Sequence, residues 1–190
     1  CFYYQVSLFR VLAANDKINL TVYFCTDEGI SGRDAQSTYG TNESWATENE
    51  LLEGYTYKIL RNYAPRGSYL KSLVGLVNLG IWNDLKRNRP DVVVIMSWMN
   101  PTWWLTFLAC MRFNIPLLLM TDANINAENL KSAWKSWIKR FVLGKFLFPV
   151  AAGFLCAGTS NRGLYESYGV PVWKLFPFAY SWGYSSMRTE

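Results

Sequence analysis

The most informative absence in this sequence of 190 residues is histidine, which does not occur at all. Catalytic triads with a histidine base, metal sites with histidine ligands and histidine acid–base catalysis are therefore excluded within this chain. The four cysteines show no CxxC or other metal-type spacing. Cys25 and Cys156 fall in expected buried strands and Cys110 in an expected helix, so we interpret them as reduced core residues.

Long apolar runs are also missing: no uninterrupted stretch reaches the length that spans a membrane, and no signal peptide is visible. We therefore expect a cytoplasmic protein. Basic residues outnumber acidic ones, and the formal net charge of +5 favours an anionic ligand or an anionic membrane surface. The Lys and Arg residues are scattered and form no recognised motif, so nucleic acid is not an expected partner.

The sequence contains no GxGxxG loop, the phosphate-binding turn of dinucleotide-binding folds. Asp27 and Glu28 end an expected strand, where an acidic residue holds a ribose in such folds. Because the glycine loop is absent, we interpret both residues as solvated loop charges. Neither a cofactor nor a metal ion is expected.

The clearest structural signal that is present lies between residues 88 and 121. Two apolar runs, residues 92–98 and 117–120, have the length of strands, and the segment between them has the length of a helix. Asn100 fits the cap of that helix and Asn114 fits its end. Neither run alternates polar and apolar residues, so both strands are expected to be covered on both faces of a parallel sheet.

Strand-like and helix-like segments alternate along the rest of the chain. The expected strands cover residues 18–25, 55–60 and 153–160, and residues 172–180 are expected to form a last strand or an extended exit. The expected helices cover residues 6–12, 69–88, 129–150 and 161–169. This order predicts an α/β fold with a doubly wound, mainly parallel, Rossmann-like sheet and helices on both faces, which makes three layers. An α/β domain normally begins with a strand, so the first strand is expected to be missing from this sequence.

Several segments resemble a known family in their order and spacing. Residues 4–12 are similar to an opening helix "YQxxLFxxL", and residues 90–94 to a "PDVV" strand entry. Residues 114–118 are similar to a "GIPVV" strand start, with Asn in place of Gly. Residues 154–161 with 168–171 are similar to the strand and helix that end an N-terminal half, and residues 177–180 to a "PxxV" exit. Together they resemble the N-terminal domain of a GT-B glycosyltransferase of the retaining family-four type.

The resemblance implies that residues 1–176 are the acceptor-side domain and that residues 177–190 lead toward a C-terminal domain that this sequence lacks. The full-length protein would be a hexosyltransferase-like enzyme. It would move a sugar from a nucleotide-sugar donor to a hydroxyl of a sugar, lipid-linked or small-molecule acceptor, without a metal. The second domain supplies most donor contacts in that family, so this fragment alone is expected to be inactive.

Polar residues follow the expected strands, where open α/β sheets bind ligands. Asp122 can orient an acceptor hydroxyl or accept its proton as a general base, and Asn124 lies in the same loop. In that family a histidine often lies just beyond this strand. Thr159 and Arg162 begin a later helix, whose free N–H groups can bind a phosphate. The alternative for Asp122 is capping of the following helix or of a tight turn. The alternative at the later helix is capping by Ser160 or Asn161, with a solvated Arg162.

Two further residues are candidate acceptor contacts. Gln5 in the opening helix can hydrogen-bond an acceptor. Trp98, with Trp103 and Trp104, can stack on the apolar face of a sugar, although the sequence favours a packed helix start.

Residues 129–150 are expected to form an amphipathic helix. One face would hold Leu130, Ala133, Trp134, Trp137, Ile138 and Phe141, and most lysines would lie on the other. A basic, tryptophan-bearing helix can lie on an anionic membrane, which would place the protein at the inner face of the membrane. A core-facing helix with a solvated lysine face has the same pattern, and we favour that interpretation slightly.

Two other functions remain open on the sequence alone. One is a non-catalytic α/β module that binds a small anionic ligand or a partner protein at the same edge of the sheet. The other is half of a sugar-nucleotide epimerase, which shares the two-domain build.

Overall fold

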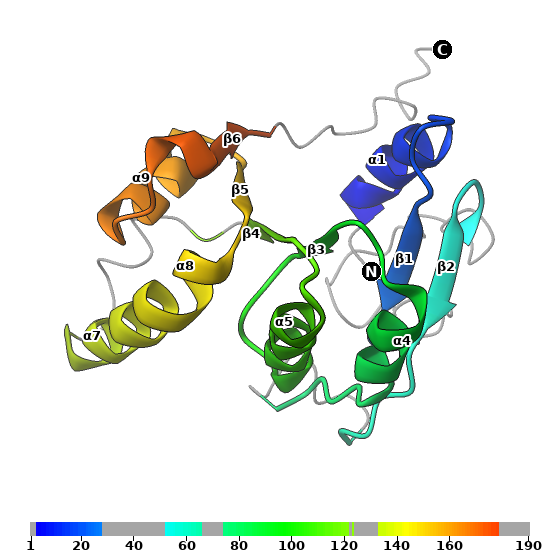
Figure 1. The fold of residues 1–190 in the computed structure, drawn as a ribbon, viewed down its shortest axis with the longest axis horizontal. Coiled ribbons are helices and arrows are strands. Elements are labelled where there is room, and N and C mark those ends of the chain that lie inside the picture. Colours follow the sequence, from blue (N-terminus) through cyan, green and yellow to red (C-terminus); the bar gives the residue numbers. More distant parts are fainter. Residues whose placement is uncertain (1–2, 28–51, 66–73, 122, 124–132, 179–190) are drawn as a thin grey trace, which may run out of the picture. The chain divides into compact units, whose positions relative to one another are not determined.

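The computed structural model describes residues 3–27, 52–65, 74–121, 123 and 133–178 (Figure 1). They form an α/β fold whose strands run parallel in two sheets. The chain divides into two compact units. The first unit is Cys1–Asn78 with Tyr180–Glu190, and the second unit is Leu79–Ala179.

The described residues of the first unit form a helix and two paired strands. They are α1 (Tyr3–Ala13), β1 (Thr21–Phe24) and β2 (Thr56–Ile59). β1 and β2 pair in parallel, from Thr21 opposite Thr56 to Phe24 opposite Ile59. The expected helix and both expected strands of this region are therefore confirmed.

Two asparagines hold the carboxyl ends of β1 and β2. Asn78 is fully buried, and its Nδ2 donates to the carbonyl oxygens of Cys25 at 2.8 Å and Arg61 at 3.0 Å. Asn62 accepts from the backbone N–H of Val77 at 2.9 Å and donates to the carbonyl of Gly75 at 3.0 Å. These hydrogen bonds hold the segment before Asn78 beside the segment that follows β2.

The helix expected over residues 69–88 needs correction because of these contacts. Within the described part of this range, the helix is α4 (Gly80–Asn88), and residues 74–79 are not helical. Asn62 and the backbone of Tyr63 take up the polar groups of Gly75 and Val77 that a helix would need. Residues 69–73 lie outside the described residues.

The second unit is built on four parallel strands in chain order. These are β3 (Val93–Ile95), β4 (Leu117–Thr121), β5 (Gly153–Cys156) and β6 (Leu175–Pro177). The helices that precede, connect or follow them are α4, α5 (Pro101–Phe113), α7 (Ala133–Val142), a π-helix (Leu143–Leu147), α8 (Phe148–Val150), α9 (Thr159–Ser167) and a 3₁₀ turn (Val172–Lys174). The expected boundary after residue 176 falls inside β6.

Aromatic side chains form the core of the second unit around β5. Phe154 is fully buried, and its ring lies 4.6 Å from that of Tyr165 and 5.2 Å from that of Phe148, measured between centroids. Burying each such side chain stabilises the fold by about 1.5–3 kcal/mol. Gly153 leaves room for a neighbouring ring: a Cβ atom at this position would lie 2.9 Å from the ring of Phe176, which would have to shift.

Two expectations for β3 and α5 need correction. Val92 and Val94 are exposed, so β3 is not covered on both faces; it is the edge strand of its sheet. Asn100 precedes α5 as expected, but its side chain makes no capping hydrogen bond. Only the backbone carbonyl of Asn100 is engaged, by the N–H of Trp103 at 3.1 Å. Asn114 does end α5, in the left-handed conformation at φ 56°.

The last two strands are shorter than expected. Of the run at residues 153–160, only residues 153–156 are in β5, and α9 begins at Thr159. The run at residues 172–180 starts as a 3₁₀ turn and continues as β6; residues 179 and 180 lie outside the described residues. Within the described part of the chain, no helix combines the length and apolar character needed to cross a membrane.

Replacing Asn78 with Ala should lower the free energy of unfolding by about 2–3 kcal/mol, because buried carbonyl groups lose their donor. Urea denaturation followed by circular dichroism measures the change. Asn83→Ala is the matched control: Asn83 is exposed on α4, and its replacement should change stability by less than about 0.5 kcal/mol. Equal effects of the two substitutions would contradict the role assigned to Asn78.

Candidate functional site

The carboxyl ends of β4 and β5 form the first candidate site, in the second unit. Parallel strands end at one edge of their sheet, where the following loops meet. Thr121 is the last residue of β4, and its Oγ1 lies 2.9 Å from the hydroxyl of Tyr165 in α9. Both side chains are buried. This hydrogen bond anchors α9 to the end of β4.

Asn161 ties the loops of this edge together. It is 5% exposed; its Oδ1 accepts from the N–H of Ala157 at 3.2 Å, and its Nδ2 donates to the carbonyl of Ala123. Ala123 directly follows Asp122, so the chain beside the proposed base is held at the start of α9. Asp122 and Asn124 themselves lie outside the described residues. The local sequence suggests Asn161 as a helix cap but gives no sign of the bond to Ala123, which is 38 residues away.

The first turn of α9 is open to an anion. Gly158 precedes the helix without a side-chain cap, and Thr159 is exposed at the first helical position. The uncapped N–H groups carry the positive end of the helix dipole. The Nε of Arg162 donates to Oε1 of Glu166 at 2.9 Å, and both side chains are about 40% exposed. A phosphate would therefore compete with Glu166 for Arg162.

Trp98 is packed inside the second unit. Its ring lies 5.9 Å from that of Phe148, edge to face, and the Nζ of Lys139 lies 5.3 Å from its centroid. Its carbonyl accepts from the indole N–H of Trp104 at 3.0 Å. Only 8% of Trp98 is exposed, which leaves a small edge for the predicted acceptor contact. Gln5 belongs to the first unit, where it is buried in α1.

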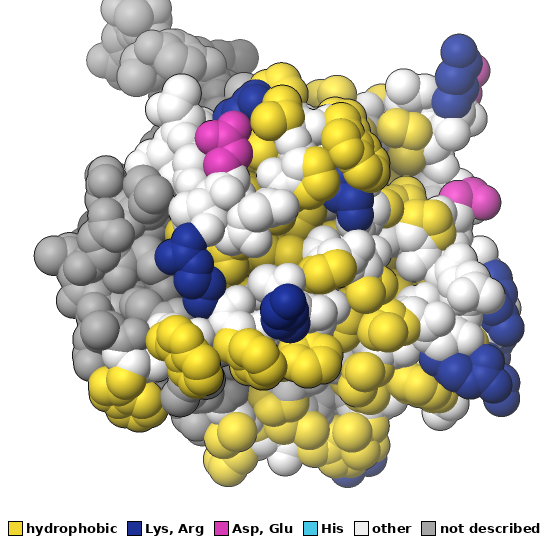
Figure 2. Space-filling view, turned by 60° about the vertical axis from the view of Figure 1, so that its left-hand side comes forward, with side chains coloured by type: hydrophobic (Ala, Val, Ile, Leu, Met, Phe, Trp, Pro, Cys, Tyr) yellow, Lys and Arg dark blue, Asp and Glu magenta, His cyan; other side chains and the backbone are white. Residues whose placement is uncertain are grey.

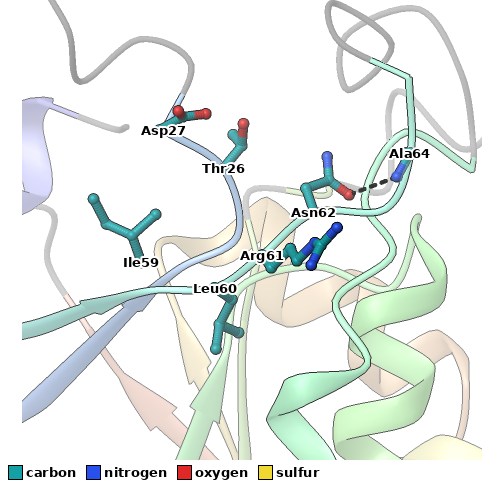
Figure 3. A pocket seen from close by; sticks show the side chains of 7 residues that line it. All are labelled: Thr26, Asp27, Ile59, Leu60, Arg61, Asn62 and Ala64. Carbon is teal, nitrogen blue, oxygen red and sulfur yellow. Dashed lines mark hydrogen bonds between the residues drawn. The ribbon is translucent and has the colours of Figure 1, made fainter.

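A second candidate site lies in the first unit, at the carboxyl ends of β1 and β2 (Figure 3). It is a cavity of about 360 Å³ lined by Thr26, Asp27, Ile59, Leu60, Arg61, Asn62 and Ala64. Pockets that bind small molecules begin at about this volume. The hydroxyl and carboxylate come from the segment after β1, and the guanidinium and amide come from the segment after β2.

The walls of this cavity are fixed by contacts within the first unit. The Oδ1 of Asn62 accepts from the N–H of Ala64 at 3.1 Å, and the guanidinium of Arg61 lies over the ring of Tyr63 at 4.9 Å. Asp27 is exposed, as expected of a solvated loop charge, yet it also lines the cavity. The signal that points to this site is a pair of polar residues after each of two neighbouring strands.

At both candidate sites, the described side chains can contact a ligand through hydrogen bonds and through charge. Among the described residues, no group of three or more His, Cys, Asp or Glu side chains is placed to hold a metal ion. Burial raises the pKa of the Cys25 and Cys110 thiols to about 11 and also raises the pKa of Cys156. These three cysteines are free thiols and stay protonated at neutral pH, so they are poor nucleophiles.

No protein-family model matches this sequence, and no curated protein matches it at a significant level.

The raised thiol pKa values predict slow alkylation of the folded chain. In a Cys1→Ser variant, iodoacetamide should react with Cys25 and Cys110 about 100-fold more slowly at pH 7 than after unfolding in urea. Because the folded pKa is raised, the rate should keep rising with pH toward 11 instead of levelling off near 9. Mass spectrometry of the labelled peptides measures the rates. Rapid labelling of these thiols in the folded protein at pH 7 would contradict the prediction.

Proposed function

We propose that this chain is the acceptor-binding N-terminal half of a GT-B glycosyltransferase, which moves a sugar from a nucleotide-sugar donor to a hydroxyl acceptor. One observation carries the proposal. Asn161 joins the chain next to Asp122 to the uncapped start of α9. A candidate base and a candidate phosphate site therefore belong to one pair of loops at the carboxyl edge of a parallel sheet.

Each part of this edge has a role in the proposed reaction. Asp122 orients the acceptor hydroxyl and accepts its proton as the new glycosidic bond forms. The N–H groups of the first turn of α9, with Arg162, stabilise the negative charge on the leaving nucleotide phosphate. Such positioning needs no metal. The C-terminal domain of the full-length protein supplies the other donor contacts, so the chain alone does not transfer sugar.

The proposal also includes a doubly wound strand order and a location in the cytoplasm. In the doubly wound strand order 3-2-1-4-5-6, strands 2 and 3 are neighbours and strands 4 onward follow one another. The pair β1-β2 matches the first set, and the order β3-β4-β5-β6 matches the second. The resemblance assigns the first strand to the chain before α1 and places helices on both faces of the sheet. The enzyme would work in the cytoplasm, where nucleotide-sugars are made.

The second candidate function is a non-catalytic module that binds a small anionic ligand. The cavity at the ends of β1 and β2 favours it, because the described residues that line this cavity belong to the first unit and include Arg61. Such a module would need no second domain.

Sugar transfer by the full-length protein should depend on Asp122. With a panel of nucleotide-sugars and acceptors, Asp122→Asn should lower kcat at least about 100-fold, the lower end of general-base effects. Release of the nucleoside diphosphate measures the rate. Asp91→Asn is the matched control, since Asp91 is an exposed acid just before β3, and it should leave kcat unchanged. A protein that consumes no nucleotide-sugar, or an Asp122→Asn variant with full activity, would refute the assignment.

Arg162 and Glu166 allow a second test of the phosphate site. Arg162→Ala should weaken donor binding about tenfold or more, because a charge-assisted hydrogen bond is lost. Glu166→Gln frees Arg162 from its partner and should keep donor binding or strengthen it. KM and kcat for the donor separate the two variants. If both substitutions change binding equally and slightly, Arg162 is only half of a surface ion pair.

A further inference from the structure

α7 and the π-helix after it carry an exposed aromatic surface. We call Trp134, Trp137, Phe141 and Phe146 the α7 aromatic surface. Trp137 is 67% exposed and Phe141 is 50% exposed, and the other two rings are exposed to a similar degree. The favoured interpretation, in which this face of the helix packs into the core, is therefore wrong for Trp134, Trp137 and Phe141.

The π-helix keeps this surface continuous. The rings of Trp137 and Phe141 are stacked with centroids 5.9 Å apart, and Phe146 meets Phe141 edge to face at 6.1 Å. In an α-helix, residues five apart point in directions that differ by roughly 140°. The wider i→i+5 turn over Leu143–Leu147 brings Phe146 back beside Phe141. Leu143 and Leu147 meanwhile remain buried in the second unit.

The charges along this part of the sequence are of one sign. No Asp or Glu occurs between Glu128 and Lys145, and this stretch contains Lys131, Lys135, Lys139, Arg140 and Lys145. Lys145 and Arg140 are exposed. Figure 2 brings forward the side on which α7 lies in Figure 1, and it shows hydrophobic side chains gathered over the lower part of that face with Lys and Arg side chains among them.

We propose that the α7 aromatic surface binds the surface of an anionic phospholipid membrane. Tryptophan and phenylalanine rings lie at the boundary between headgroups and acyl chains, while neighbouring cations lie at the level of the lipid phosphates. A second copy of the chain is a poorer occupant, because it would bring the same cations against each other. The anionic lipid supplies the opposite charge.

This membrane contact is independent of sugar transfer. It rests on exposed side chains of α7 and the π-helix, not on Asp122 or α9. A failure of either proposal would therefore leave the other in place.

Vesicle flotation tests the proposal with the whole chain. Vesicles of phosphatidylcholine mixed with phosphatidylglycerol should carry the protein upward in a density gradient, and vesicles of phosphatidylcholine alone should carry little of it. Binding should fall as salt is added, because salt screens the attraction between the cations and the lipid phosphates. Equal flotation with both vesicle types would overturn the proposal.

Matched variants test which side chains bind. The double variant Trp137→Ser with Phe141→Ser should reduce binding at least about tenfold, because two apolar rings no longer leave water. The control Trp173→Ser removes an equally exposed tryptophan outside α7 and should bind normally. Lys145→Gln should weaken binding about fivefold, as expected for one cation near an anionic membrane. Lys86→Gln removes an exposed charge from α4 and should have little effect.

Two results would overturn the assignment of the surface. One is normal flotation of the Trp137→Ser, Phe141→Ser variant. The other is a dimer in analytical ultracentrifugation that this variant abolishes, which would make a second copy the occupant. Circular dichroism checks that the double variant is folded; Lys145→Glu, which changes only an exposed side chain, gives the same test if it is not.

Discussion

The structure depends on one constraint: the backbone polar groups where parallel strands end must find partners away from water. Each compact unit meets this constraint with a buried asparagine. Asn78 donates to backbone carbonyls after β1 and after β2, and Asn161 joins the turn after β5 to the segment after β4. An asparagine amide suits this role because it both donates and accepts within one short side chain.

These two side chains explain why candidate sites lie where they do. A loop that leaves a sheet is a useful binding element only if its first residues are held in place. Asn78 and Asn62 hold the walls of the cavity that contains Asp27 and Arg61, and Asn161 holds the chain next to Asp122. The same hydrogen bonds that satisfy the backbone therefore also position the polar side chains of each edge.

The helix region over residues 133–150 shows how one sequence pattern fits two structures. A stripe of aromatic residues opposite a stripe of lysines fits a core-facing helix and an interfacial helix equally well. In this chain the aromatic stripe is exposed, and the buried residues near it are Leu143 and Leu147 of the π-helix. Over the π-helix, Leu143 and Leu147 are buried while Phe146 remains exposed beside Phe141.

Apolar runs and helix ends such as Asn114 are set by residues that are neighbours in the sequence. The class of fold, the parallel strands and most positions of the helices and strands could therefore be predicted from the sequence. Other features depend on hydrogen bonds between residues that are far apart in the sequence. Residues 74–79 of the helix expected over residues 69–88 are not helical, because Asn62 takes the backbone groups of Gly75 and Val77 from 13 and 15 residues away. Likewise, no local pattern shows that Asn161 reaches across 38 residues to Ala123, since that contact exists only once the strands have paired.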